Sequence, residues 1–225
     1  MTSPRVSAFR WVPPFAQGLV RDLRVRWALE EVGLAYEERL IGPEDQRSET
    51  YLSLQPFGQV PSYEEDGLVL FESGAIVLHI AERSDKLLPS GAEARARTKT
   101  WMFAALNTVE PPIMFLNALD MLQDGGESAK LLRPAVVGEV KKRLVSLCCL
   151  LDERDYLQDR FTAADLLMVT VLRILQRTGL VEEVPALYSY RLRCEARPAF
   201  QKALADQMAR FAENAPTNSA SDRPY

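Results

Sequence analysis

Apolar and polar residues follow two different patterns along the chain, and the change comes near residue 90. Before this point, short runs rich in β-branched and aromatic residues alternate with stretches of helical period. The pattern predicts strands and helices in the order β-α-β, a short irregular helical piece, then β-β-α. The predicted strands are 6–11, 36–41, 59–65 and 68–71, and the predicted helices are 17–32 and 73–83.

Two turn signals support this interpretation of the first part. Gly33 directly follows the last apolar position of the first helix, where glycine commonly ends a helix in the left-handed conformation. The pair Asp66-Gly67 stands between two apolar runs, which predicts a tight hairpin. The first part therefore combines a sheet and helices.

The second part is predicted to be all helical. One long helix over 94–122 should be kinked or broken at Pro111-Pro112, and Pro134 should lie in the first turn of a helix over 133–155. Two more helices are expected over 162–178 and 198–213. The fold class is thus an α/β domain followed by an all-α helical bundle. The expected divisions are 1–86, a linker 87–93, a helical domain 94–213 and a flexible tail 214–225.

Composition and charge exclude several function classes. The 225 residues are 47% hydrophobic and 26% charged, which is typical of a globular protein rather than a disordered one. The net charge of −4 argues against a nucleic-acid partner, because phosphate contacts need a basic surplus. No stretch of the sequence is apolar for long enough to predict a membrane partner.

Histidine and cysteine are too scarce for most metal sites or a disulfide framework. His79 is the single histidine, in a row with Ile76 and Ile80, and packing is its expected role. The cysteines are Cys148, Cys149 and Cys194. Free cysteines and a first segment without an apolar signal region predict a cytoplasmic protein. The scarcity of histidine and cysteine predicts that no metal is bound.

The candidate chemistry lies in 55–75, QPFGQVPSYEEDGLVLFESGA. A cis bond between Val60 and Pro61, at the start of a strand, would turn the Val60 backbone outward to pair with an extended peptide. Ser73 is suited to cap the next helix, whose first N–H groups favour an anion. Together, Val60, Pro61, Glu72 and Ser73 would hold a short peptide with a free carboxylate. The alternative is a purely structural turn and cap.

These motifs resemble those of the cytosolic glutathione S-transferases of the bacterial type. The resemblance rests on the element order, on QVP followed by ES, and on a second motif, FTAADLL at 161–167. In that motif Thr162 and Asp165 form a capping box at a helix start. The resemblance covers about 5–212 and implies a thioredoxin-like domain that binds glutathione, followed by the helical bundle.

The resemblance also implies roles for individual residues. The Val60 backbone, beside cis-Pro61, would pair with the cysteinyl part of glutathione. Ser73 would bind the γ-glutamyl carboxylate through its hydroxyl and backbone N–H, and Glu72 would bind the ammonium group. Gln59 would contact the glycyl end.

The residue that activates the glutathione thiol is missing from its usual place. The stretch RVRWALEE at 24–31 sets the register of the first helix and puts Leu19 where the family carries a hydroxyl or thiol. Two substitutes are considered: the Arg21 side chain, or backbone N–H groups at the helix start. Arg21 would alternatively lie, with Arg24 and Arg26, on a solvated face. Trp11 and Phe15 would line a pocket for the second substrate or belong to the core.

The sequence therefore predicts a glutathione transferase that joins the thiolate of glutathione to an electrophilic, largely apolar small molecule, in a role such as detoxification. Glutathione is a co-substrate, and no covalently bound cofactor is expected. A homodimer is implied by the resemblance. Two alternatives stay open: a glutathione-dependent isomerase, peroxidase or dehalogenase on the same scaffold, and a non-catalytic binding or interaction protein.

Overall fold

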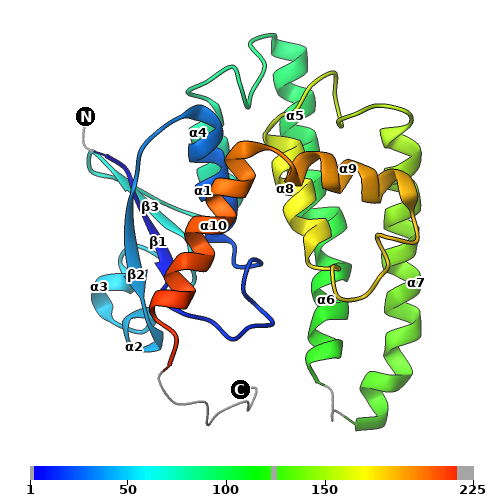
Figure 1. Ribbon diagram of the computed structural model, residues 1–225, viewed down its shortest axis with the longest axis horizontal. Helices are drawn as coiled ribbons and strands as arrows, with labels where there is room; N and C mark the ends of the chain where they lie inside the picture. The colour runs from blue at the N-terminus through cyan, green and yellow to red at the C-terminus, as the bar shows by residue number, and fades with distance from the viewer. Residues whose placement is uncertain (1–2, 123–125, 217–225) are drawn as a thin grey trace. The chain divides into compact units, whose positions relative to one another are not determined.

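Residues 3–122 and 126–216 are described by a computed structural model, and they form two units (Figure 1). The first unit contains the chain up to Leu88 and the segment that begins at Arg197. The second unit runs from Pro89 to Ala196.

The first unit is built on a four-stranded mixed sheet in the order β2-β1-β3-β4. β1 and β2 are parallel, whereas β3 is antiparallel to both β1 and β4. The strands are β1 (Arg5–Phe9), β2 (Glu37–Ile41), β3 (Ser62–Glu65) and β4 (Leu68–Phe71), and the helices before the domain change are α1 (Asp22–Val32), α2 (Pro43–Gln46), α3 (Glu49–Leu52) and α4 (Ser73–Ala81). This order confirms the predicted α/β first domain.

Two of the predicted turns are confirmed, and the start of the first helix was wrong. Gly33 has φ +79° and ends α1, and Asp66 and Gly67 both have positive φ in the β3–β4 hairpin. The helix predicted from residue 17 begins only at Asp22. Gly18 has φ +75°, a left-handed conformation that an α-helix does not accommodate, so the chain forms turns over 14–19 instead.

The second unit consists of helices, as the sequence predicts. They are α5 (Ala92–Ala104), the π-helical segment η1 (Ala105–Val109), α6 (Glu110–Met121), α7 (Gly126–Leu151), α8 (Ala163–Arg173) and α9 (Pro185–Glu195). The break in the long helix lies at η1, before Pro111 and Pro112. Proline lacks an N–H and its ring crowds the carbonyl four residues earlier, so the distortion falls in the preceding turn.

One further prediction for this unit was wrong, and one helix was missed. Pro134 lies inside α7 rather than in its first turn, because α7 begins at Gly126. Pro134 is exposed. The helix α9 was not predicted, since its apolar positions do not follow a clear helical stripe.

The capping box at the start of α8 is confirmed. The Thr162 hydroxyl accepts from the Ala164 N–H at 3.3 Å, and the Asp165 carboxylate accepts from the Thr162 N–H at 2.9 Å. Asp165 also accepts from the Leu157 N–H at 2.8 Å and the Tyr190 hydroxyl at 2.9 Å. The Thr162 hydroxyl is the fourth donor to Asp165, at 3.0 Å. Burial raises the pKa of this carboxyl, and the four donated hydrogen bonds act in the opposite direction.

The last helix, α10 (Pro198–Glu213), has the predicted bounds but belongs to the first unit, where it lies along α1 (Figure 1). The Phe200 ring packs edge-to-face on Trp27 of α1, with centroids 4.7 Å apart. Just before α10, Arg197 holds both carboxylate oxygens of Glu31 at 2.6 and 2.7 Å. The sequence alone had placed this helix with the helical domain, 94–213.

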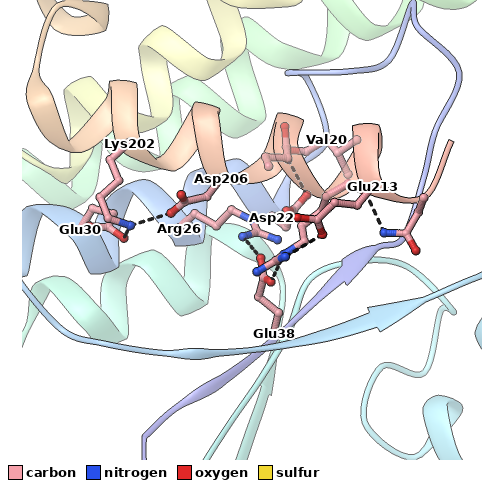
Figure 2. Close-up of polar contacts among 11 residues, drawn as sticks. Val20, Asp22, Arg26, Glu30, Glu38, Lys202, Asp206 and Glu213 are labelled. Atoms are coloured by element: carbon pink, nitrogen blue, oxygen red, sulfur yellow. Dashed lines mark hydrogen bonds and ion pairs between the residues drawn. The ribbon is translucent and has the colours of Figure 1, made fainter.

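A polar network continues this contact into the sheet (Figure 2). Gln207 of α10 donates to Asp22 at 2.8 Å, and Asp22 accepts from Arg26 at 2.7 Å. Glu38 of β2 accepts from both Arg26 and Arg210. Burial raises the pKa of the Asp22 carboxyl, while the ion pair with Arg26 opposes the shift. The network therefore joins α10, the first turn of α1 and β2.

Among the described residues, no helix has the length and apolar character needed to cross a membrane. The predicted flexible tail, 214–225, falls largely on 217–225, which lie outside the described residues.

Candidate functional site

The residues of the predicted peptide site lie at one end of the paired strands β3 and β4. Ser62 at the start of β3 pairs with Phe71 at the end of β4. Val60 and Pro61 directly precede the first member of this pair, and Glu72 and Ser73 directly follow the second. The hairpin register therefore brings the two predicted halves of the site to the same end of the strands.

The bond between Val60 and Pro61 is cis, as predicted. Val60 is buried, with 7% of its surface exposed, and Gln59 is exposed. Within the described ranges, 3–122 and 126–216, no hydrogen bond uses the Val60 backbone N–H or carbonyl. Both groups are thus available to an extended peptide, as the sequence analysis expects.

A chain of buried hydroxyl groups holds the backbone on both sides of this bond. The Tyr51 hydroxyl donates to the Gln59 carbonyl at 2.6 Å, so its own oxygen accepts from the Ser7 hydroxyl at 2.8 Å. Ser7 in turn accepts from the Ser62 hydroxyl at 2.9 Å and the Ser62 N–H at 2.6 Å. Burial raises the pKa of Tyr51, so this phenol keeps the proton that it donates.

Sequence reasoning missed these hydroxyl residues. Ser7 is a buried polar position inside the apolar strand β1, which is the one signal that the sequence offered. Tyr51 lies in α3, which the sequence showed only as an irregular helical piece. The contacts of Ser7 with Tyr51 and Ser62 join residues more than forty positions apart, and Tyr51 reaches Gln59 across a loop, so no local pattern predicts them.

The loop before the cis bond depends on a glycine. Gly58 has φ +63°, and a Cβ atom there would lie 2.9 Å from the Gln46 carbonyl oxygen. The Gln46 side chain donates to the Gly58 carbonyl at 2.7 Å. A larger residue at position 58 would meet both a strained backbone and a close contact.

The second half of the site differs from the prediction in one respect. Glu72, not Ser73, is the N-cap of α4, and Ser73 is the first residue of the helix. Glu72 has φ +69°, which is uncommon for a residue with a side chain and is often found at functional sites. Its side chain makes no capping hydrogen bond, so the first N–H groups of α4 face the helix end without a side-chain cap. That end is suited to an anion.

The start of α1 is joined to this same place. Arg24, in the first turn of α1, donates to the Ser73 hydroxyl at 3.2 Å. Arg21, the candidate thiol-activating residue, directly precedes α1 and is partly buried. The alternative of a solvated face was wrong for Arg24 and Arg26, which are 3% and 1% exposed and hydrogen-bond inside the first unit. Position 19, where the resemblance places a thiol-activating hydroxyl or thiol, is Leu19, and it lies in a turn rather than in a helix.

The aromatic residues proposed for the second substrate lie in the segment between β1 and α1. Phe15 is 37% exposed and Trp11 is partly exposed, which disfavours the alternative that they belong to the core. Their pocket role stays a prediction.

His79 of α4 lies apart from the predicted site residues. Its Nε2 atom is 3.8 Å from a carboxylate oxygen of Glu65, and its ring packs edge-to-face on Tyr63. Ile76 and Ile80 are buried, whereas the His79 side chain is 32% exposed. His79 therefore packs at the margin of the apolar row.

Over the described part of the chain, no group of three or more His, Cys, Asp or Glu residues is placed to hold a metal ion. The three cysteines are free.

Comparison with known proteins decides the family. Residues 17–82 match the family described as glutathione S-transferase, N-terminal domain, and residues 100–198 match its C-terminal domain. Glutathione S-transferase 3 of Zea mays is 32% identical over 204 residues, which are 81% of this chain and 88% of that protein. The chain belongs to the cytosolic glutathione S-transferase family.

Other members of the glutathione S-transferase family match about nine tenths of this chain. Glutathione S-transferase 4 of Zea mays is 29% identical over 90% of this chain and 93% of that protein. A glutathione transferase family member from Pseudomonas fluorescens, solved with two glutathione bound, superposes with a TM-score of 0.78. It is 25% identical and covers 89% of this chain and 92% of its own.

The segment that matches the N-terminal domain, residues 17–82, contains all the residues predicted to bind glutathione. It also contains Arg21 and Arg24, whereas Trp11 and Phe15 precede it.

Proposed function

We propose that the protein is a glutathione transferase, in which the thiolate of bound glutathione attacks an electrophilic, largely apolar small molecule. The observation that carries this proposal is that the cis Val60-Pro61 bond and the start of α4 lie at the same end of β3 and β4. A free backbone and a helix N-terminus at the same end of the strands suit a short peptide that ends in a carboxylate. The bound glutathione in the relative from Pseudomonas fluorescens supports this ligand.

The assignments of single residues follow the family resemblance. The N–H and carbonyl of Val60 would pair with the cysteinyl part of glutathione. The Ser73 hydroxyl and backbone N–H would bind the γ-glutamyl carboxylate, and the exposed Glu72 carboxylate would bind its ammonium group. Gln59 would contact the glycyl end.

Catalysis requires a thiolate, because the free thiol of cysteine has a pKa near 8.5 and is a weak nucleophile. The start of α1 offers two ways to stabilise the thiolate. The Arg21 guanidinium would supply a positive charge, and the backbone N–H groups of the first turn would supply hydrogen bonds and the helix dipole. Trp11 and Phe15 would hold the apolar part of the second substrate beside it.

Calorimetric titration with reduced glutathione tests the ligand. We expect the wild-type protein to bind glutathione and Ser73→Ala to bind it about tenfold more weakly, the loss of a charge-assisted hydrogen bond. Ser53→Ala is the matched control, because Ser53 is exposed and its hydroxyl donates only to the Thr50 carbonyl within α3 and its neighbours. If the wild type gave no heat and no thermal stabilisation at millimolar glutathione, the proposed ligand would be wrong.

The pH profile of conjugation separates the two modes of thiol activation. Arg21→Met should raise the apparent pKa of the bound thiol and lower kcat/KM near neutral pH, and Arg21→Lys should retain part of the effect. Arg47→Met, at an exposed position of the same unit, is the control. An unchanged profile in Arg21→Met would exclude the guanidinium and leave the backbone N–H groups.

We also propose that the protein forms a homodimer. The first unit exposes an apolar patch in which Phe57, 68% exposed, packs edge-to-face on Phe71 with ring centroids 6.0 Å apart, and Leu68 and Val69 are each 41% exposed. Large exposed apolar patches commonly mark interfaces. Sedimentation of Phe57→Ser should show dissociation, whereas Leu192→Ser on α9 should leave the assembly unchanged. Equal sedimentation of both variants and the wild type would exclude this patch.

The three free cysteines support a reducing cytoplasm, and detoxification of electrophiles is the cellular role that we propose.

A non-catalytic binding protein is the second candidate. It is favoured by the absence of Ser, Thr, Cys and Tyr from 10–46 apart from Tyr36. Turnover of an activated aryl halide such as chlorodinitrobenzene with glutathione, above the uncatalysed rate, would rule it out.

A further inference from the structure

One buried hydrogen bond at the proposed glutathione site has a polarity that fixes the direction of a hydroxyl group. The Arg24 guanidinium donates to the Ser73 hydroxyl oxygen at 3.2 Å. Arg24 is 3% exposed and Ser73 is 5% exposed. The bond joins the first turn of α1 to the first residue of α4, so the two helix starts lie beside each other.

Only one assignment of donor and acceptor is possible in this pair. A guanidinium group carries donors and no acceptor, so the Ser73 oxygen must accept. The hydroxyl hydrogen of Ser73 is then left to point away from Arg24. Among the described residues, Ser73 donates no hydrogen bond, so its hydrogen is available to a ligand.

The guanidinium also changes how strongly that hydrogen binds an anion. A hydroxyl that accepts from a cation is polarised and becomes a better donor. The positive charge lies in a buried place, where it is screened less than at the surface. Both effects favour a carboxylate in front of Ser73 over a neutral group.

We infer that Arg24 is a positioning residue for glutathione. Arg24 does not itself contact the ligand. It turns the Ser73 hydroxyl so that its hydrogen meets the γ-glutamyl carboxylate, and it places a buried positive charge behind that hydroxyl. This inference rests on the proposed function, because it assumes that glutathione binds with its carboxylate at the start of α4.

A purely structural role for Arg24, a link that holds α1 against α4, makes a different prediction. Such a link would support every ligand of the site alike. A positioning role acts through one carboxylate, so it should be seen with glutathione and lost with an otherwise identical peptide that lacks this carboxylate. The probe is 4-aminobutyryl-cysteinyl-glycine, which is glutathione without the α-carboxylate of its first residue.

The experiment measures the affinity of both peptides by calorimetry for the wild type, Arg24→Met and Arg24→Lys. Arg24→Met should weaken glutathione by about tenfold and the probe by less than about twofold. Arg24→Lys retains a cationic donor and should recover most of the preference for glutathione. With an electrophile present, KM for glutathione should rise in Arg24→Met while kcat stays within about twofold of the wild type.

A double-mutant cycle gives a second measurement that depends on the same bond. In the Ser73→Ala background, replacing Arg24 by Met should weaken glutathione by clearly less than the roughly tenfold of the single change, because the hydroxyl that Arg24 orients is already gone and only the direct effect of the charge remains. Circular dichroism establishes that each variant is folded. If Arg24→Met does not fold, the preference for glutathione over the probe is compared in Arg24→Lys and Ser73→Ala. A preference retained in Arg24→Lys and lost in Ser73→Ala supports the positioning role, and a preference unchanged in Ser73→Ala overturns it.

The outcomes separate this inference from the proposed function. A wild type that binds glutathione while Arg24→Met binds both peptides equally weakly, or both as well as the wild type, would overturn the positioning role. The same holds for a double variant whose loss equals the product of the two single losses. A wild type that does not bind glutathione at all would overturn the proposed function instead.

Discussion

Replacing Asp165 by alanine should be among the most destabilising single changes in the second unit. Asp165 is fully buried, and its two carboxylate oxygens accept four hydrogen bonds at the start of α8. The donors are the backbone N–H groups of Leu157 and Thr162 and the hydroxyls of Thr162 and Tyr190. Burial and the nearby carboxylate raise the pKa of Tyr190, so this phenol remains a donor.

The magnitude follows from what the four donors lose. The two hydroxyls can rotate toward other acceptors, but the two backbone N–H groups cannot, and each buried donor left without a partner costs about 1–3 kcal/mol. Loss of the helix cap is part of the same change. We expect Asp165→Ala to lower the free energy of unfolding by about 3–5 kcal/mol, a large share of the total for an ordinary domain.

The assay is urea unfolding followed by circular dichroism, together with hydrogen exchange of the Leu157 and Thr162 amides, which should become faster. Asp165→Asn should lie between the wild type and Asp165→Ala, because an amide has one accepting oxygen in place of two. Asp159→Ala, at an exposed position nearby, is the control and should change stability by less than about 0.5 kcal/mol. A loss below about 1 kcal/mol in Asp165→Ala, with unchanged amide exchange, would show that these four hydrogen bonds do not stabilise the start of α8.

Three more predictions concern the first unit. Tyr51→Phe removes the donor to the Gln59 carbonyl and should raise KM for glutathione about three- to tenfold with little change in kcat; an unchanged KM would show that the hydroxyl chain does not hold the loop. Phe200→Ala leaves a cavity beside α1 and should cost about 3–5 kcal/mol in urea unfolding, and a cost below about 1 kcal/mol would mean that α10 does not depend on this ring. The pKa of Glu65 is partly raised by burial, but its hydrogen bonds, above all that with Arg83, lower it below the ordinary 4.5. A lowered carboxyl pKa stabilises the fold above its unfolded value and loses this effect as pH falls through the folded value, so the stability difference between the wild type and Arg83→Met should be constant near pH 7 and shrink below about pH 4.5; a difference independent of pH would contradict this.

The elements of this protein could be predicted from the sequence where local rules determine them. Gly33 ends α1, Asp66 and Gly67 form the hairpin, and Thr162 with Asp165 caps α8. Each of these features depends on residues within a few positions of one another, so the sequence displays them directly. The bounds of α10 were predicted for the same reason.

The errors have local causes as well. The first helix was extended too far because Leu19 fits its apolar spacing, but Gly18 adopts a left-handed conformation that ends the helical pattern. Pro134 was placed in a first turn because proline is common there, yet an exposed helix face tolerates the loss of one hydrogen bond within a long helix such as α7.

From the sequence alone, the fold class, the order of the strands and first helices along the chain, and the residues of a peptide site could be predicted, among them Val60, Pro61 and Ser73. Three features are visible only in the folded chain: α10 packs on α1, Tyr51 holds the backbone before the cis bond, and Arg24 donates to Ser73. Periodicity, turn residues and caps are energies of neighbouring positions, and the sequence carries them in order. The contacts that position the site residues join positions that are not close neighbours in the chain, eight residues apart in Tyr51–Gln59 and 49 in Arg24–Ser73. These partners meet only when the sheet and its helices have packed around a common core.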